Sequence, residues 1–193
     1  MQAVKNERRW LVWLIVIYSA GVAARALIAL LFSQNPFIMP DEALYLNIAR
    51  SIADGGGIAL RNQPITYTSL LYPLIISPVY ALCPAGAQFR AVQLVGCFMM
   101  NLAVFPAFGI ARRAADRKTA LFIAALSILL PDMLLTSRAM TEAVSYPLFL
   151  LTVYLMFDKL SEEKTSAVWA VFTGAAAFIL TQLKAGSAAL AAV

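Results

Sequence analysis

Long apolar stretches alternate with short polar stretches along almost the whole chain. The first apolar stretch runs from Trp10 to Phe32 and contains a single charge, Arg25. A helix needs about 20 apolar residues to cross about 30 Å of hydrocarbon. The stretch is too long for the apolar part of a cleaved signal peptide, although Ala24-Arg25-Ala26 loosely resembles a cleavage site. We therefore expect an uncleaved membrane helix, in which Arg25 either reaches the interface or faces a polar interior.

The longest polar stretch, residues 33–68, contains the pattern of a short amphipathic helix. The helix is expected to open at Pro40, and Leu44, Ile48 and Ile52 then recur on one face, with Tyr45 and Ala49 beside them. The glycines at 55–57 are expected to end it. Acidic residues in the first turn suit the positive end of the helix dipole. The pattern predicts a helix that lies flat on the membrane interface, in the first extracytoplasmic loop.

Two further stretches decide the direction of the chain. The stretch Tyr67–Cys83 is apolar but is interrupted by Pro73 and Pro78, and Ala91–Ala111 is a clear span. A basic cluster follows that span directly. If Tyr67–Cys83 does not cross, this cluster lies on the same side as the basic N-terminus, as the positive-inside tendency favours. We therefore interpret Tyr67–Cys83 as non-crossing. The cluster consists of Arg112, Arg113, Arg117 and Lys118.

The later stretches predict three more crossings. Thr119 to about Leu135 runs outward, about Ala139 to Phe157 returns inward, and Thr165–Leu183 runs outward again. Residues 186–193 begin another apolar run that is too short to span. The pattern predicts an all-α, polytopic bundle of about five crossings plus an incomplete sixth. Residues 1–193 would form a single membrane domain of the cytoplasmic (inner) membrane, with a cytoplasmic N-terminus.

The composition agrees with a membrane location. The chain is 62% hydrophobic and 13% charged, whereas a soluble domain is about 45–50% apolar and about 25% charged. The net charge of +5 comes from residues at the ends of apolar runs, where they act as topology signals, so we expect membrane lipid and no nucleic acid as a partner. The chain has no histidine, so acid–base chemistry would fall to carboxylates.

The predicted topology gathers several charged residues on the outer face. Each carboxylate near a helix start is by itself more often a cap than a catalyst. Together, two carboxylate pairs at the ends of neighbouring spans can form one water-accessible pocket at the membrane surface, where acidic side chains are costly unless they are functional. The residues are Asp41, Glu42, Asp132, Arg138 and Glu142.

Four segments resemble the GT-C superfamily of membrane glycosyltransferases, in particular bacterial relatives of protein O-mannosyltransferases and aminoarabinose transferases. Pro40–Ile58 is similar to the family's first extracytoplasmic loop, and Tyr72–Ile75 to its broken hydrophobic segment. Arg112-Arg113 and the segment from Leu130 to Ala143 resemble its basic turn and its second acidic motif. The resemblance covers about residues 10–183 in order and spacing, and identifies the chain as the N-terminal part of a larger GT-C module.

The resemblance implies transfer of a sugar from a polyprenyl-phosphate donor to an acceptor (a lipid, a glycan or a protein) on the outer face. Asp41 would be the catalytic base, and Glu42 and Glu142 would complete an acidic wall. Arg138, and as a weaker candidate Arg61, would bind the leaving phosphate. Arg61 is more readily interpreted as a lipid-headgroup anchor. The chemistry requires no metal, although clustered carboxylates can hold Mg²⁺ or Mn²⁺, so no cofactor is assigned.

Two other functions fit parts of the pattern. A transporter subunit would use Asp132, Glu142 and Arg25 as a polar pathway, with ionisable groups near the midplane and repeated broken helices. A non-catalytic membrane scaffold would use all of these charges to solvate its loops. The acidic residues lie at helix ends and no second half is visible, which favours the glycosyltransferase. The incomplete last span leaves open whether this chain is active alone.

Overall fold

The structure is a computed structural model that describes residues 2–32, 36, 39–61, 63–65, 69–129, 138–160 and 167–183. Most of the described residues are helical, so the predicted all-α class is confirmed. A two-stranded antiparallel ribbon is the one departure within this part of the chain, and the sequence pattern does not predict it. The elements are α1 (Gln2–Phe32), α2 (Pro40–Ala53), β1 (Ala59–Leu60), β2 (Gln63–Pro64), α3 (Leu71–Leu82), a 3-10 turn η1 (Ala85–Ala87), α4 (Gln88–Asn101), α5 (Val104–Ala111), α6 (Arg117–Ser127), α7 (Glu142–Leu160) and α8 (Ala167–Leu183).

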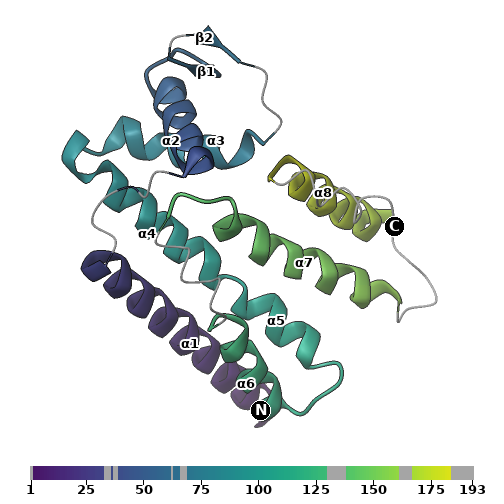
Figure 1. Ribbon diagram of the computed structural model, residues 1–193. Helices are drawn as coiled ribbons and strands as arrows, with labels where there is room; N and C mark the ends of the chain where they lie inside the picture. The colour runs from purple at the N-terminus through teal and green to yellow at the C-terminus, as the bar shows by residue number, and fades with distance from the viewer. Residues whose placement is uncertain are drawn as a thin grey trace.

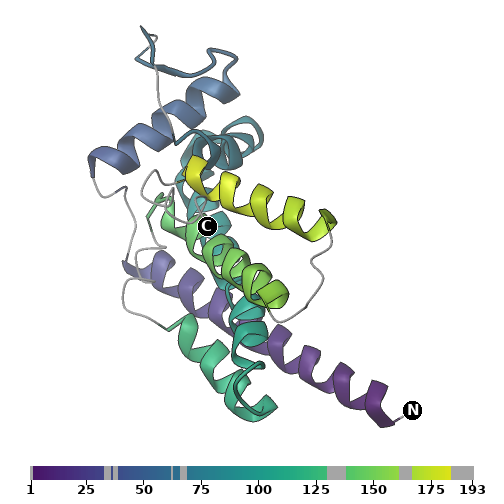
Figure 2. The ribbon, with the colours of Figure 1, turned by 90° about the vertical axis from the view of Figure 1, so that its right-hand side faces the viewer.

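The helices form a bundle with a separate group of elements at one end. Contacts connect α1 to α4, α4 and α5 to α7, and α7 to α8, while α6 packs against α5. In Figures 1 and 2 these helices run along the molecule, and α2, α3 and the ribbon gather at the end away from the N-terminus. The molecule therefore has two distinct ends.

Within the described part of the chain, two helical stretches are long and apolar enough to cross a membrane. They are Arg9–Phe32 in α1 and Ala85–Ala111, which spans η1, α4 and α5. Apolar helices that fall short of the same test are Leu71–Leu82, Glu142–Phe157 and Ala167–Leu183. At about 1.5 Å per residue, the 12 residues of α3 extend only about 18 Å, well under the thickness of a bilayer core. The number of crossings beyond these two stays a prediction, and residues 130–137 and 184–193 lie outside the described residues.

The expected span Ala91–Ala111 is two helices rather than one. Pro106 lacks the amide hydrogen that would be donated to the carbonyl of Leu102 in a continuous helix. The amides of Leu102 and Ala103 instead bond three residues back, to Met99 at 3.1 Å and Met100 at 3.2 Å. The chain tightens into a short turn there, and α5 begins at Val104. Proline therefore explains the break.

Helix α2 begins and ends as predicted, but its buried face is different. Pro40 occupies the first helical turn, and Gly55, with φ of +79°, ends the helix in a conformation that favours glycine. The buried residues are Glu42, Tyr45, Ile48 and Ala49. Three of them belong to the predicted apolar face, whereas Leu44 and Ile52 on that face are only partly buried. The reason is tertiary, because α2 contacts both α3 and the ribbon and so packs within the protein.

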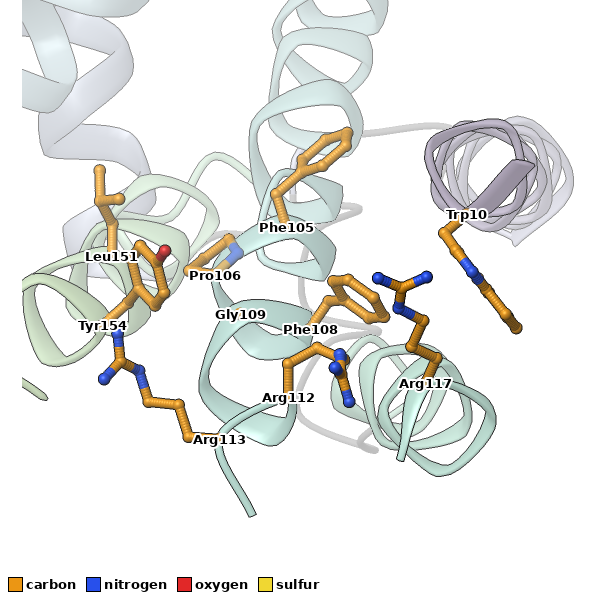
Figure 3. A pocket seen from close by; sticks show the side chains of 10 residues that line it. All are labelled: Trp10, Phe105, Pro106, Phe108, Gly109, Arg112, Arg113, Arg117, Leu151 and Tyr154. Atoms are coloured by element: carbon orange, nitrogen blue, oxygen red, sulfur yellow. The ribbon is translucent and has the colours of Figure 1, made fainter. Parts of the chain in front are cut away.

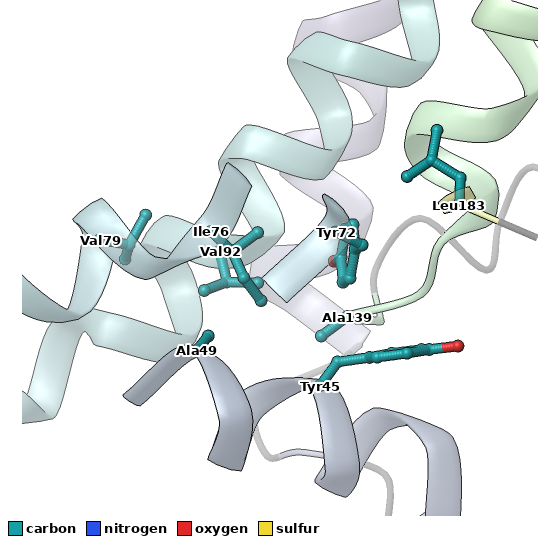
Figure 4. Close-up of a cluster of buried hydrophobic side chains, with 8 residues drawn as sticks. All are labelled: Tyr45, Ala49, Tyr72, Ile76, Val79, Val92, Ala139 and Leu183. Atoms are coloured by element: carbon teal, nitrogen blue, oxygen red, sulfur yellow. The ribbon is translucent and has the colours of Figure 1, made fainter. Parts of the chain in front are cut away.

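Two apolar clusters hold the two ends of the bundle. Figure 4 shows the cluster that joins α2, α3, α4 and α8 through Tyr45, Tyr72, Ile76, Val92 and Leu183. The rings of Tyr45 and Tyr72 are both buried in this cluster. A second cluster joins α1, α5 and α6 and contains Leu14, Ala103, Val104, Ala107, Ala124 and Ile128.

Candidate functional site at the α2 end

Glu42 is a buried carboxylate that connects two distant parts of the chain. Its side chain is 1% exposed. The backbone amide of Ala139 donates a hydrogen bond to Glu42 Oε1 at 3.0 Å across 97 residues of sequence. A buried amide needs such an acceptor, because an unmade bond costs about 1–3 kcal/mol. Glu42 therefore fixes the start of α2 against the segment that leads into α7.

Tyr72 lies beside this connection, at the start of α3. Its ring is 1% exposed and meets the ring of Tyr45 edge-on, with centroids 5.4 Å apart. Its hydroxyl is buried and has no hydrogen-bond partner among the described residues. Burial raises the pKa of Tyr72 above its ordinary value, and the nearby charges of Glu42 and Glu142 raise it further. Both carboxylates therefore act electrostatically on the same hydroxyl.

Glu142 and Arg138 stand on the segment that Glu42 holds. Glu142 opens α7 and is half-buried, and Thr141 Oγ1 lies 3.4 Å from its Oε2. Arg138 is also half-buried, and its Nη1 lies 3.5 Å from Sδ of Met39, the residue just before α2. Glu42, Arg138 and Glu142 therefore lie at the same end of the molecule.

Asp41 faces a different space from Glu42. Adjacent residues on an α-helix point about 100° apart, and Asp41 is exposed while Glu42 is buried. Asp41 lines a cavity of about 560 Å³ between α2 and the ribbon. Arg61, Asn47 and Gln63 line the same cavity. The cavity therefore combines a carboxylate, a guanidinium and two amide side chains.

Arg61 is held in an unusual backbone conformation. It follows β1 in the turn of the ribbon, where Leu60 pairs with Gln63. Its φ of +52° is the only positive value at a non-glycine residue in the described part of the chain. A left-handed conformation costs an ordinary residue about 1–2 kcal/mol, and such strain tends to occur at functional positions. The ribbon thus keeps Arg61 in the turn beside the cavity that Asp41 lines.

The predicted site residues therefore fall into two groups on two sides of α2. Glu42, Arg138 and Glu142 belong to the buried side, and Asp41 and Arg61 to the cavity. Asp132 lies outside the described residues. The sequence does not predict that Tyr72 lies beside the acidic residues, or that Asn47 and Gln63 line the cavity. The ribbon forms one wall of this cavity, but its strands are only two residues each, too short to give a recognisable strand pattern in the sequence.

Arg25 connects α1 to α4 and to the end of α6, and it belongs to neither of these two groups of site residues. Of the two predicted orientations, the structure has the one that faces the interior. Arg25 is buried, and it donates to Asn101 Oδ1 on α4 at 3.5 Å and to the carbonyl of Ile128, just after α6. Asn101 is thus an interhelical hydrogen-bond partner of Arg25. These contacts give Arg25 a structural role in the bundle.

The described residues contain no group of three or more His, Cys, Asp or Glu side chains that could hold a metal ion. Comparisons with protein-family models, with curated proteins and with solved structures find no match for this chain. A helical fold alone does not specify an activity. The functional argument therefore depends on the side chains at the α2 end.

Proposed function

We propose that this chain is part of a GT-C-type membrane glycosyltransferase, with its donor and acceptor meeting at the α2 end. The donor would be a polyprenyl-phosphate-linked sugar, and the acceptor would approach from outside the cytoplasmic membrane. The observation that carries the proposal is the cavity of about 560 Å³ that Asp41 and Arg61 both line. Glycosyl transfer from a phosphate needs a base on one side and a cation on the other.

The outer surface of the bundle supports the membrane location. Large apolar side chains on α1, α6 and α8 are half or more exposed, although soluble proteins rarely leave extended apolar patches open to water. Lipid tails would cover such surfaces. Examples with more than half of their surface exposed are Leu27 and Leu31 on α1, Phe122 on α6, and Val171, Phe172 and Phe178 on α8.

The proposed reaction balances as a displacement at the anomeric carbon. The acceptor oxygen forms the new bond to that carbon, and its proton passes to the carboxylate of Asp41. The bond from the anomeric carbon to the phosphate oxygen breaks, and its electron pair leaves with the polyprenyl phosphate. The guanidinium of Arg61 stabilises the charge that grows on this leaving group. Arg138, beside Met39, lies on the buried side of α2 and does not line this cavity.

Glu42 has a different proposed role from Asp41. Because its Oε1 accepts the amide of Ala139 and its side chain is buried, Glu42 is a positioning residue. It fixes the orientation of α2 and hence the direction in which Asp41 points. Glu142 contributes negative charge near Tyr72 on the same buried side. The acidic wall is thus divided into one reacting group and two supporting groups.

Replacing Asp41 tests the base directly. The chain is reconstituted in lipid nanodiscs, and transfer is measured with polyprenyl-phosphate mannose and polyprenyl-phosphate aminoarabinose as donor probes. Asp41→Asn should lower transfer at least about 100-fold, because a positioned general base contributes that much or more. Asp54→Asn is the matched control, since Asp54 is an exposed aspartate just after the other end of α2. It should leave transfer unchanged.

Two outcomes would contradict the proposal. The first is full transfer by Asp41→Asn. The second is an absence of transfer and of binding with both donor probes in a well-folded unmodified chain. Arg61→Gln provides an independent check, because it should weaken donor binding while the amide side chain keeps the volume of the cavity lining.

The sidedness of the molecule is tested by cysteine labelling. Both native cysteines are first replaced, and a single cysteine is introduced at Asn47 on α2 or at Lys118 on α6, both of which are exposed. A membrane-impermeant reagent applied outside intact cells should label the cysteine at 47 and not the one at 118. Labelling of both from the same side would contradict the predicted topology.

A further inference from the structure

One side of α3 is apolar and is not covered by the described part of the chain. Leu74, Pro78, Ala81 and Leu82 are exposed, and the helical repeat of 3.6 residues places them on the same side of the helix. Leu82 has 82% of its surface exposed. The other side of α3 packs against α2, α4 and α8, and the helix contains no charged residue. A helix that is apolar all round is normally buried all round, so the exposed side of α3 favours an apolar occupant.

The backbone of α3 is satisfied internally in spite of its proline. In lipid, every main-chain carbonyl needs a donor from the protein itself. Pro78 has no amide hydrogen to donate to the carbonyl of Leu74, and Ser77 Oγ donates to that carbonyl at 3.0 Å instead. The carbonyl that the proline would leave open is thus hydrogen-bonded without water, as an apolar environment requires.

Gln88 connects the end of α3 to the start of α4. Its Nε2 donates to the carbonyls of Tyr80 and Cys83, each at 3.3 Å, and carbonyls at the end of a helix have no partner within the helix. In the first turn of α4, Arg90 Nη1 donates to the carbonyl of Ala29 on α1 at 2.8 Å. The end of α3, the start of α4 and the last part of α1 therefore meet at one place.

Aromatic and basic side chains mark the opposite end of the bundle. They line a cavity of about 600 Å³, and Figure 3 shows Arg112 and Arg117 on the Trp10 side of α5, with Arg113 beside Tyr154 on its other side. Arg117 stacks over the ring of Trp10 at 5.9 Å, and Arg113 over the ring of Tyr154 at 5.7 Å. Tryptophan, tyrosine and basic residues are typical of a membrane–water interface, so this end fits one boundary of a bilayer.

The length of α1 relates the two ends to a bilayer. From Trp10 to Ala29 the helix extends about 28 Å at about 1.5 Å per residue, close to the thickness of about 30 Å of a hydrocarbon core. Leu30, Leu31 and Phe32 continue α1 and are each more than half exposed. If one boundary lies near Trp10, lipid tails therefore reach the level at which α3 meets α4.

We propose that α3 is embedded in the membrane leaflet at the α2 end, with its exposed side against lipid acyl chains. The 12 residues of α3 extend about 18 Å, which is enough for one leaflet but not for the whole core of about 30 Å. In Figure 1, α3 runs across the α2 end at a clear angle to α4. This inference rests on the proposed membrane location and extends it to a helix that is too short to cross.

The neighbouring side chains favour lipid over a second copy of the chain. Arg50 is exposed at the end of α2 and stacks over the ring of Tyr80 at 5.4 Å, and arginine beside tyrosine suits the level of lipid headgroups. A second copy could cover α3, but it would leave the exposed apolar side chains at the end of α1 in water. Lipid tails cover both surfaces at once.

Tryptophan fluorescence in brominated lipid tests the position of α3. Trp10→Phe, Trp13→Phe and Trp169→Phe remove every native tryptophan, and Leu82→Trp or Leu74→Trp then introduces one on the exposed side of α3. Each protein is reconstituted in phosphatidylcholine vesicles with or without bromine on the acyl chains. Both variants should lose most of their emission in the brominated vesicles, because bromine quenches only on close approach. Unchanged emission in either folded variant would overturn the proposal.

Two matched variants calibrate this measurement. Leu27→Trp, on an exposed part of α1, gives the loss expected of a lipid-facing position, and Gln63→Trp, on the exposed ribbon, gives the value for water. Loss of emission in Leu27→Trp but not on α3 would overturn the α3 proposal alone. No loss in Leu27→Trp would overturn the membrane location, and the α3 proposal with it. Circular dichroism must show unchanged helix content in each variant that is compared.

Iodide in the buffer separates the remaining occupants of this surface. It should quench Gln63→Trp and leave Leu82→Trp nearly unchanged, because iodide does not enter the acyl region. Equal quenching of both by iodide would show that α3 faces water. Quenching of Leu82→Trp by neither iodide nor bromine would show that a second copy or another protein covers α3. Either result would overturn the proposal.

Discussion

The two ends of the bundle hold their charged side chains in opposite ways. At the α2 end, Glu42 is buried and bonded to the backbone of Ala139. At the other end, Arg113 and Arg117 remain at the edge of an open cavity and are steadied by carbonyl oxygens and rings. The first arrangement connects two distant segments of the chain, and the second holds guanidinium groups against carbonyl oxygens and aromatic rings. The groups around its polar atoms thus decide whether a charged residue near a helix end connects two segments or lines a cavity.

The largest expected effect is the loss of the connection at Glu42. Glu42→Ala should lower the free energy of unfolding by about 3 kcal/mol, because the Ala139 amide loses its acceptor and a cavity remains. Glu42→Gln keeps an acceptor oxygen and should change stability much less. The check is the midpoint of unfolding in detergent. Equal stability of Glu42→Ala and the unmodified chain would show that this end does not depend on the buried carboxylate.

The next effect concerns the packing of α5 on α7, at the end of the bundle opposite α2. A Cβ atom at Gly109 would lie 2.6 Å from Cε2 of Tyr154, so Gly109→Ala must displace the ring that supports Arg113. The expected cost is about 1–3 kcal/mol in the free energy of unfolding. Gly174→Ala is the control, because a Cβ there meets nothing within 4 Å. Gly174→Ala should be neutral or stabilising. Wild-type stability in Gly109→Ala would contradict the close packing of α5 on α7.

A smaller effect of opposite sign is expected at Arg61. Arg61→Gly relieves the positive φ and should raise stability by up to about 1 kcal/mol, while it removes the proposed phosphate-binding cation. Thermal unfolding and donor binding, measured on the same sample, separate the two consequences. A variant that is both less stable and fully able to bind donor would contradict both the strain and the role of Arg61.

The smallest effect is a pH dependence of stability that arises from Asp116, the residue that caps the start of α6. The pKa of Asp116 is lowered in the folded protein by hydrogen bonds led by that from Thr119. Its stabilising effect is therefore complete above the ordinary value of 3.8 and is lost as the pH falls through the lowered folded pKa. Asp116→Asn keeps the cap but does not titrate. Unfolding curves between neutral and acidic pH should differ between the two proteins only at the acidic end.

The sequence predicts well the features that depend on local chemistry. Pro40 and the glycines at 55–57 mark the ends of α2, and the length of Trp10–Phe32 predicts α1. These outcomes follow from proline, glycine and apolar run length, each of which acts within one segment.

Features that depend on tertiary partners are not predictable in the same way. The sequence predicts an apolar face around Leu44 and Ile52 with Tyr45 and Ala49 beside it, but contact with α3 rotates the buried side toward Tyr45 and Ala49. That rotation separates Asp41 from Glu42, which the sequence treats as one acidic pair. It also leaves Arg61, the weaker candidate by sequence, in the cavity with Asp41. The break after Asn101 has a local signal in Pro106, which an apolar run alone conceals.

Several long-range connections in this protein end on main-chain atoms. Glu42 receives the amide of Ala139, Arg25 reaches the carbonyl of Ile128, and Arg90 reaches the carbonyl of Ala29 at 2.8 Å. Every residue type carries a carbonyl, and every type except proline carries an amide hydrogen. The receiving positions can therefore drift in evolution without breaking the bond, and pairs such as 42 and 139 should show little co-variation. Proline at 139 is the one replacement that would remove the donor itself.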